Sequence, residues 1–182
     1  MTQRIHVTGG PGSGKTTAAR RIARELSLPF YELDQILIEA GGDMARLRRE
    51  DRAAIVADQE EWVSEGAFFD WARPLFECAQ LVVWLDLPWR VASYRILVRY
   101  LKAELARKNQ HPGLRRLREF WTWSYRYYHD AHPHALNQQG VPLTRARAVE
   151  ELRRYEQKLA VCRSKRDVDL LVTEQRGGTT KP

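Results

Sequence analysis

The segment 7-VTGGPGSGKTT-17 places four glycines and a proline directly before Lys15 and two threonines. Glycine adopts positive φ and lets a ligand approach the backbone closely, but it costs conformational entropy on folding. A plain turn between a strand and a helix needs only one or two glycines. The density of glycine in this segment therefore indicates that the backbone itself wraps around a ligand.

The spacing of this segment identifies the ligand class. Residues 9–16 fit the phosphate-binding loop (P-loop) pattern G-x-x-x-x-G-K-[ST]. A β-branched stretch at 3–8 precedes the loop, and a helical pattern follows over 15–27. The dinucleotide-binding pattern G-x-G-x-x-G does not fit, because Lys15 stands where its third glycine belongs. We interpret the segment as a P-loop whose backbone N–H groups, together with the start of the following helix, bind phosphates.

The P-loop assigns roles to individual residues. Lys15 is expected to reach the β- and γ-phosphate oxygens of ATP, and the Thr16 hydroxyl is expected to bind Mg²⁺. Thr17 is expected to cap the helix or to contact the α-phosphate. The predicted nucleotide-binding residues are Gly9, Gly10, Pro11, Gly12, Ser13, Gly14, Lys15, Thr16 and Thr17.

Apolar periodicity and turn residues predict strands that alternate with helices. The expected strands are 3–8, 29–33, 61–65, 80–88 and 167–173. The expected helices are 15–27, 43–60, 73–79, 89–108, 113–130 and 145–165, with a frayed tail at 174–182. This order predicts an α/β fold of the P-loop NTPase type, in which a five-stranded parallel sheet is flanked by helices and binds ligands at its carboxyl end. We interpret residues 1–182 as one domain that contains a helical, basic lid at 90–147.

Composition narrows the classes of protein. No apolar run approaches the length of a membrane span, and the first strand leaves no room for a signal peptide. Cys78 and Cys162 lack metal-site spacing, so we expect a cytoplasmic protein with reduced cysteines and no membrane partner. The sequence does not indicate an oligomeric state.

The net charge of +7 is unevenly distributed. Residues 90–147 hold twelve basic and three acidic side chains, hence +9, and the rest of the chain holds eighteen basic and twenty acidic ones. Such a patch attracts nucleic acid or small polyanions such as nucleotide phosphates. The alternative, for part of these charges, is that they simply form the solvated face of a helix. The aromatic side chains of 118–134 either stack on bases or, more simply, pack on a neighbouring helix.

Three carboxylates stand at the ends of predicted strands. Asp34, expected on the strand beside the P-loop strand, either accepts a proton from an acceptor hydroxyl and holds the substrate, or caps a helix. Glu65 is expected to contact magnesium or its water shell. Asp86 precedes Leu87-Pro88, which is typical of helix capping, so we favour a structural role for it.

Basic side chains follow the last of these strands. Arg95, Arg99 and Lys102 share one face of a predicted helix, and such a row needs an anionic partner such as a triphosphate. We therefore assign Arg95 and Arg99, together with Lys15 and Asp34, to catalysis. Arg73 either grips an anionic group of the acceptor or is a surface arginine.

With these residues in place, the chain resembles the adenylate kinase-like P-loop kinases of small molecules, and most closely the DNA topology modulation proteins. The resemblance rests on 9-GGPGSGKTT-17, 28-LPFYELDQI-36, 60-EEWVSEGAFFDWARPLFE-77 and 81-LVVWLDLPWRVASYRILVR-99. It implies ATP and Mg²⁺ at the P-loop and an unidentified small-molecule acceptor beside Asp34 and Arg73. It also implies a lid that carries Arg95 and Arg99, with Arg126 as a further substrate-binding residue.

Two functions from different classes fit these features. The leading hypothesis is a kinase that transfers the γ-phosphate of ATP to a small molecule, with a nucleotide or nucleoside among the candidate acceptors. The alternative is a nucleotide-dependent protein that binds nucleic acid or regulates another protein, which the basic segment 90–147 favours. The intact Lys15 and Thr16 argue against a degenerate ATP-binding scaffold.

Overall fold

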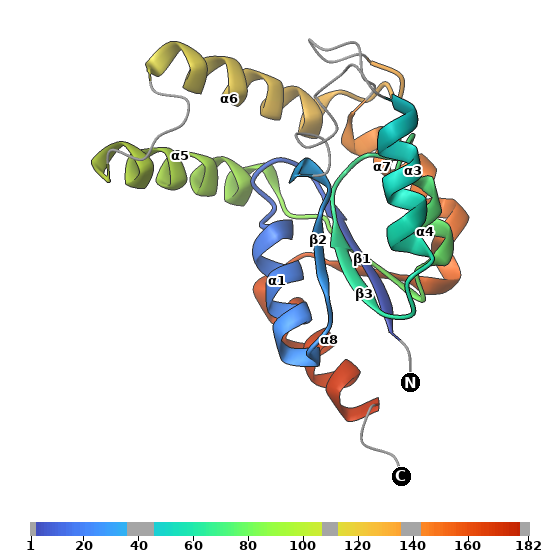
Figure 1. Ribbon diagram of the computed structural model, residues 1–182. Helices are drawn as coiled ribbons and strands as arrows, with labels where there is room; N and C mark the ends of the chain where they lie inside the picture. The colour runs from blue at the N-terminus through green and yellow to red at the C-terminus, as the bar shows by residue number, and fades with distance from the viewer. Residues whose placement is uncertain (1–2, 36–45, 107–112, 136–142, 179–182) are drawn as a thin grey trace.

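A five-stranded, all-parallel sheet forms the centre of the computed structural model, which describes residues 3–35, 46–106, 113–135 and 143–178 (Figure 1). The spatial order of the strands is β2-β3-β1-β4-β5. The strands are β1 (Arg4–Gly9), β2 (Phe30–Glu32), β3 (Trp62–Glu65), β4 (Leu81–Leu85) and β5 (Leu159–Cys162). The predicted α/β fold with five parallel strands is confirmed.

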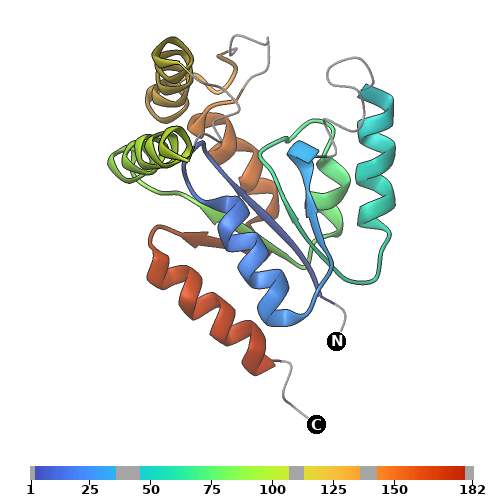
Figure 2. The same ribbon diagram turned by 60° about the vertical axis from the view of Figure 1, so that its left-hand side comes forward.

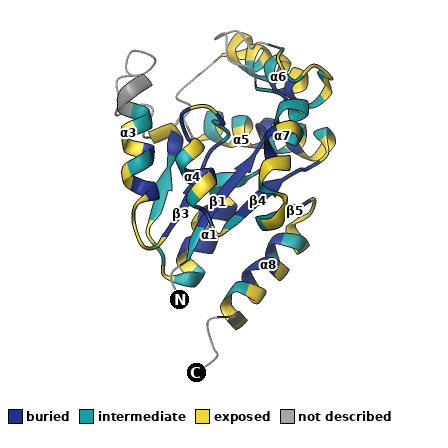
Figure 3. Ribbon diagram, turned by 90° about the vertical axis from the view of Figure 1, so that its right-hand side faces the viewer, coloured by how far each residue is buried: buried dark blue, intermediate teal, exposed yellow. Residues whose placement is uncertain are grey.

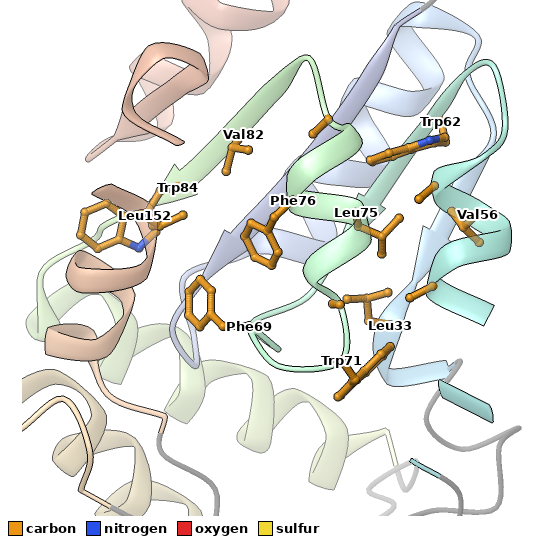
Figure 4. Packing of buried hydrophobic residues seen from close by; sticks show 14 of the residues in the cluster. Leu33, Val56, Trp62, Phe69, Trp71, Leu75, Phe76, Val82, Trp84 and Leu152 are labelled. Carbon is orange, nitrogen blue, oxygen red and sulfur yellow. The ribbon is translucent and has the colours of Figure 1, made fainter. Parts of the chain in front are cut away.

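Helices cover both faces of this sheet (Figure 2). One face carries α1 (Lys15–Leu26) and α8 (Lys165–Gly178), which bury apolar side chains against β1, β3, β4 and β5. The other face carries α3 (Arg46–Ala57), α4 (Arg73–Cys78) and α7 (Arg145–Leu152), and α7 leads into the 3₁₀ helix η2 (Arg153–Lys158). Trp62, Leu75 and Phe76 are almost fully buried at the centre of this second layer (Figure 4). The strands are thus enclosed between two apolar layers, and the exposed residues gather on the outer faces of the helices (Figure 3).

Strand β1 divides its side chains between the two layers. Ile5 and Val7 belong to the layer of α1 and α8, whereas the ring of His6 lies 4.2 Å from the ring of Phe76 in the other layer. His6 is fully buried, and its Nδ1 atom is hydrogen-bonded to the Ser64 hydroxyl at 2.8 Å. Burial lowers the pKa of His6 to about 3, so this ring stays neutral at physiological pH.

Helices α5 (Trp89–Leu105) and α6 (Leu114–His129) lie side by side and extend away from the carboxyl end of the sheet (Figure 1). Aromatic rings of α6 pack around Trp89 of α5: the ring centres of Trp121, Tyr125 and Tyr128 lie 5.4, 5.7 and 5.5 Å from that of Trp89. This contact explains the aromatic segment by packing on a neighbouring helix. Within the described residues, no helix combines the length and apolar character needed to cross a membrane.

The prediction for the C-terminal third of the chain is partly wrong. Residues 167–173, expected as the last strand, belong to helix α8, and the fifth strand lies at 159–162, inside the predicted helix 145–165. Val168, Leu171 and Val172 recur at helical spacing and are buried against α1 and the sheet. Ser164 and Asp167 start the helix by reciprocal hydrogen bonds, in which the Ser164 hydroxyl accepts from the Asp167 N–H and the Asp167 carboxylate accepts from the Ser164 N–H.

Other boundaries also differ from the predictions. Residues 174–178, expected as part of the tail, belong to α8, which continues to Gly178. The predicted helical residues 43–45 and 107–108 and the tail 179–182 lie outside the described residues. The strand that precedes Asp34 does not lie beside the P-loop strand as expected, because β3 intervenes between β2 and β1.

Candidate functional site

The P-loop connects β1 to α1 at the carboxyl end of the sheet (Figure 1). Gly12 and Gly14 have φ of +73° and +85°, a region of backbone conformation that side chains disfavour. Gly14, the N-cap residue of α1, makes no side-chain cap hydrogen bond, and among the described residues the first turn of the helix holds no acidic side chain. The first N–H groups of α1 therefore remain available to an anion, as the motif predicted.

A cavity of about 470 Å³ opens between the P-loop, α5 and the start of α8. Lys15, Thr16 and Thr17 line it, and so do Arg95 and Arg99 of α5. The remaining polar or charged lining residues are Ser13, Arg21, Ser164 and Lys165. Among the described lining residues, five are basic and none is acidic. The electrostatic field of this cavity therefore favours a polyanion.

Glu65 joins the P-loop to the end of β3. The Thr16 hydroxyl donates a hydrogen bond of 2.9 Å to Glu65 Oε1. Glu65 is fully buried, and its Oε2 atom has no hydrogen-bond partner within the described part of the chain. Burial raises the pKa of this carboxyl, while the nearby Lys15 and the Thr16 hydroxyl lower it. An incompletely satisfied buried carboxylate beside a P-loop threonine is suited to a cation.

Two further carboxylates lie next to Glu65. Glu32 stands opposite Glu65 in the parallel register of β2 and β3, and the carboxylate oxygens of Glu32, Asp34 and Glu65 lie within 4.8 Å of one another. Opposed like charges on neighbouring strands are destabilising, and only part of the charge is compensated by Arg20, which contacts Glu32 at 2.7 Å. Glu32 was not predicted as a site residue. Its position at the carboxyl end of a strand was the available signal, but its register partner follows only from the structure.

Asp34 is the exposed member of this group. It lies within a helical turn at 33–35 that follows β2, rather than before the first helical residue. Leu33 is fully buried and lies over Gly66, where an added Cβ would come within 2.6 Å of Leu33 Cδ1. The missing side chain of Gly66 thus allows the turn to approach the end of β3, which places Asp34 near Glu65.

The three basic side chains on this face of α5 do not all reach the cavity. Arg95 donates a 2.7 Å hydrogen bond to the Ser13 carbonyl oxygen, and the Arg99 guanidinium lies 5.7 Å from the centre of the Phe120 ring. Arg95 and Arg99 reach the cavity, whereas Lys102 is exposed farther along the helix.

Asp86 and two arginines lie outside the cavity lining. Asp86 accepts two hydrogen bonds of 2.7 Å from Arg145, which tie the end of β4 to the start of α7. This contact is structural, but it is not the expected helix cap, because Pro88 is the N-cap residue of α5 and no side-chain cap hydrogen bond is made there within the described residues. Arg73 is exposed at the start of α4, with Tyr155 as an electrostatic neighbour, and Arg126 is exposed on α6. The acceptor-binding roles of Arg73 and Arg126 stay predictions.

Known proteins share the loop and the fold of this chain. A family model described as an AAA domain matches residues 8–67, which hold the P-loop, Asp34 and Glu65. A shikimate kinase of Paracidovorax citrulli (strain AAC00-1) is 41% identical over 63 residues. That match spans 34% of this chain and 34% of the relative, so the chain aligns with about a third of the length of this curated relative.

Solved structures extend the likeness to the whole fold. Shikimate kinase from Bacteroides thetaiotaomicron superimposes with a TM-score of 0.52 at 19% identity, over 98% of this chain and 99% of that one. A gluconokinase from Sinorhizobium meliloti 1021 gives 0.50 at 16% identity, over 99% and 98% of the two chains. The fold is therefore the one seen in P-loop small-molecule kinases, and the likeness to such kinases is confirmed.

Proposed function

We propose that this protein is an ATP-dependent phosphotransferase that moves the γ-phosphoryl group to a hydroxyl of a small-molecule acceptor. The proposal rests on one observation: the start of α1 lies between a basic cavity and a group of carboxylates. On one side, Lys15 and Thr16 line the basic cavity. On the other side, the Thr16 hydroxyl contacts Glu65, which adjoins Glu32 and Asp34. A phosphate donor and a hydroxyl acceptor thus have neighbouring sites of opposite charge.

The basic cavity supports binding of ATP. Its volume of about 470 Å³ lies within the range of small-molecule sites. The free N–H groups at the start of α1 and the Lys15 ammonium are suited to the β- and γ-phosphates, while Arg95 and Arg99 add positive charge. The donor site is therefore assigned to residues 9–17 with these two arginines.

The carboxylates fit Mg²⁺. This ion prefers oxygen ligands and binds through one or two carboxylates together with substrate phosphates. Thr16 and Glu65 would hold it, because the buried Glu65 Oε2 has no hydrogen-bond partner within the described residues and Glu32 adds charge beside it. When bound there, Mg²⁺ would neutralise the negative charge that develops during transfer.

The side chains of this chain then account for the transfer. Asp34 accepts the proton of the acceptor hydroxyl as the hydroxyl oxygen forms a bond to the γ-phosphorus and the bond from that phosphorus to the bridging oxygen breaks. ADP leaves, and the exposed Asp34 releases its proton to water. Lys15, Arg95 and Arg99 hold the negative charge that shifts toward the leaving oxygens.

The test measures ADP release from Mg²⁺-ATP with a panel of acceptors. The panel holds nucleosides, nucleoside monophosphates, sugars and sugar acids, and it includes shikimate and gluconate because two similar proteins are named for kinases of these compounds. We expect acceptor-dependent ADP release that disappears in Lys15→Ala. As a matched control, Lys158→Ala removes a lysine that contacts the Glu77 and Ala79 carbonyls outside the cavity, and it should retain turnover. Absence of acceptor-dependent release across the panel would overturn the proposal.

A further inference from the structure

Helices α5 and α6 form a hairpin that packs against the backbone of the P-loop. A Cβ atom added to Gly10 would lie 2.2 Å from Tyr127 Cε1 of α6. One added to Gly12 would lie 2.6 Å from the Ala92 carbonyl oxygen of α5. These two glycines therefore allow the helices to lie against the loop backbone, a requirement separate from contact with phosphate.

Each helix of the hairpin also donates one hydrogen bond to a carbonyl group of the loop. The Tyr128 hydroxyl of α6 donates to the Pro11 oxygen at 2.9 Å. Arg95 of α5 donates to the Ser13 oxygen at 2.7 Å. Burial raises the pKa of Tyr128, so its hydroxyl keeps its proton and remains a donor at physiological pH.

These bonds fix the direction of two N–H groups. A trans peptide unit is planar, and its C=O and N–H bonds point in opposite directions. A Pro11 carbonyl that points toward Tyr128 therefore turns the Gly12 N–H away from α6, and a Ser13 carbonyl that points toward Arg95 turns the Gly14 N–H away from α5. Gly12 and Gly14 both line the cavity.

We propose that Tyr128 is a positioning residue for nucleotide binding: it holds the Pro11–Gly12 peptide so that the Gly12 N–H faces the phosphates. This inference rests on the proposed function, since it takes the cavity to be the phosphate site, and it gives α6 a part in that site although Tyr128 does not line the cavity.

Tyr128→Phe tests the proposal, because it removes the hydroxyl and keeps the ring that packs on Trp89 and Tyr127. We expect the ADP affinity, measured by calorimetry, to weaken about threefold to tenfold, as for one hydrogen bond. The melting temperature should stay close to that of the wild type. The matched control is Tyr125→Phe, which alters an exposed tyrosine of the same helix that also packs on Trp89, and it should bind ADP like the wild type.

A second measurement reports on the loop without nucleotide. The ¹⁵N order parameter of the Gly12 amide should fall below the rigid-backbone value of about 0.85 in Tyr128→Phe, but not in Tyr125→Phe. Equal ADP affinity of Tyr128→Phe and wild type would overturn the proposal, and so would an unchanged Gly12 amide. If the wild type binds no ADP, the proposed function fails, and the Gly12 amide alone then decides whether Tyr128 orders the loop.

Discussion

Gly10→Ala isolates the contact between the P-loop and helix α6. Gly10 is not among the glycines with positive φ, so its backbone accepts a side chain. The new Cβ, however, would lie 2.2 Å from Tyr127 Cε1 and 2.8 Å from Cδ1 and Cζ, where carbon atoms prefer about 3.5–4.0 Å. Tyr127 is buried and cannot swing into solvent. Overpacking of this kind costs about 1–3 kcal/mol, so for about 2 kcal/mol the melting temperature should fall by roughly 4–8 °C.

A double-mutant cycle assigns this loss to the ring. Thermal unfolding is followed by circular dichroism without nucleotide, for Gly10→Ala in the wild-type and Tyr127→Ala backgrounds. Tyr127→Ala alone costs about 3–5 kcal/mol as a buried aromatic, but Gly10→Ala should then add almost nothing, which gives a coupling free energy of about 2 kcal/mol. Gly177→Ala in α8 is the control, because its Cβ meets no atom within 4 Å and alanine favours helix. An equal loss in both backgrounds would refute this reasoning.

Four further predictions concern charge. Lys15→Ala should abolish turnover without unfolding the protein, because the charge at the β- and γ-phosphate oxygens is lost; turnover at the wild-type rate by a folded variant would contradict the P-loop assignment. Asp34→Asn should keep ATP affinity and melting temperature near wild type but lower acceptor-dependent turnover about 10²-fold or more, and unchanged turnover would exclude Asp34 as the base. Arg99→Ala should lower kcat by as much as about 10³-fold with a smaller change in ATP affinity, whereas a change in KM alone would limit Arg99 to ground-state binding. Because the pKa of His6 is lowered to about 3 in the folded protein, the unfolded chain binds a proton at His6 at a higher pH than the folded protein does. The free energy of unfolding, measured with urea, should therefore be about 2 kcal/mol lower at pH 5 than at pH 7. The raised pKa of Glu65 changes the stability in the opposite direction as the pH falls, so the His6 contribution is measured by comparing the wild type with His6→Gln. The loss of stability between pH 7 and pH 5 should be smaller in His6→Gln, and identical pH profiles of the two proteins would disprove this prediction.

The sequence predicted the structure best where a short run of consecutive residues determines the local conformation. The P-loop motif and the apolar run at 80–88 carry their own local signals, and both lie where they were expected. The last strand was placed wrongly, because β5 has only four residues, whereas the run 167–173 is longer and also contains four apolar side chains. The Ser164-x-x-Asp167 start signal and the helical spacing of 168, 171 and 172 were present in the sequence and favoured a helix.

The candidate site was harder to predict where it depends on register. Glu65 was assigned to magnesium from its place at a strand end, but Glu32 was missed because its pairing with Glu65 arises between strands that are distant in sequence. The same reason explains the omission of Tyr128, whose hydroxyl meets the Pro11 carbonyl across 117 positions of the chain. Contacts of this kind follow from how helices pack and not from a local pattern.

The contact of Leu33 with Gly66 bears on how such a protein can diverge. Leu33 is fully buried and fits over a residue without a side chain, so apolar packing fixes the turn that carries Asp34, whereas the Asp34 side chain itself is exposed. Replacement of the exposed residue therefore changes the chemistry offered to an acceptor without displacing the backbone that presents it. A single substitution at this position can therefore remove the proposed proton acceptor while the turn and the neighbouring P-loop are inherited unchanged.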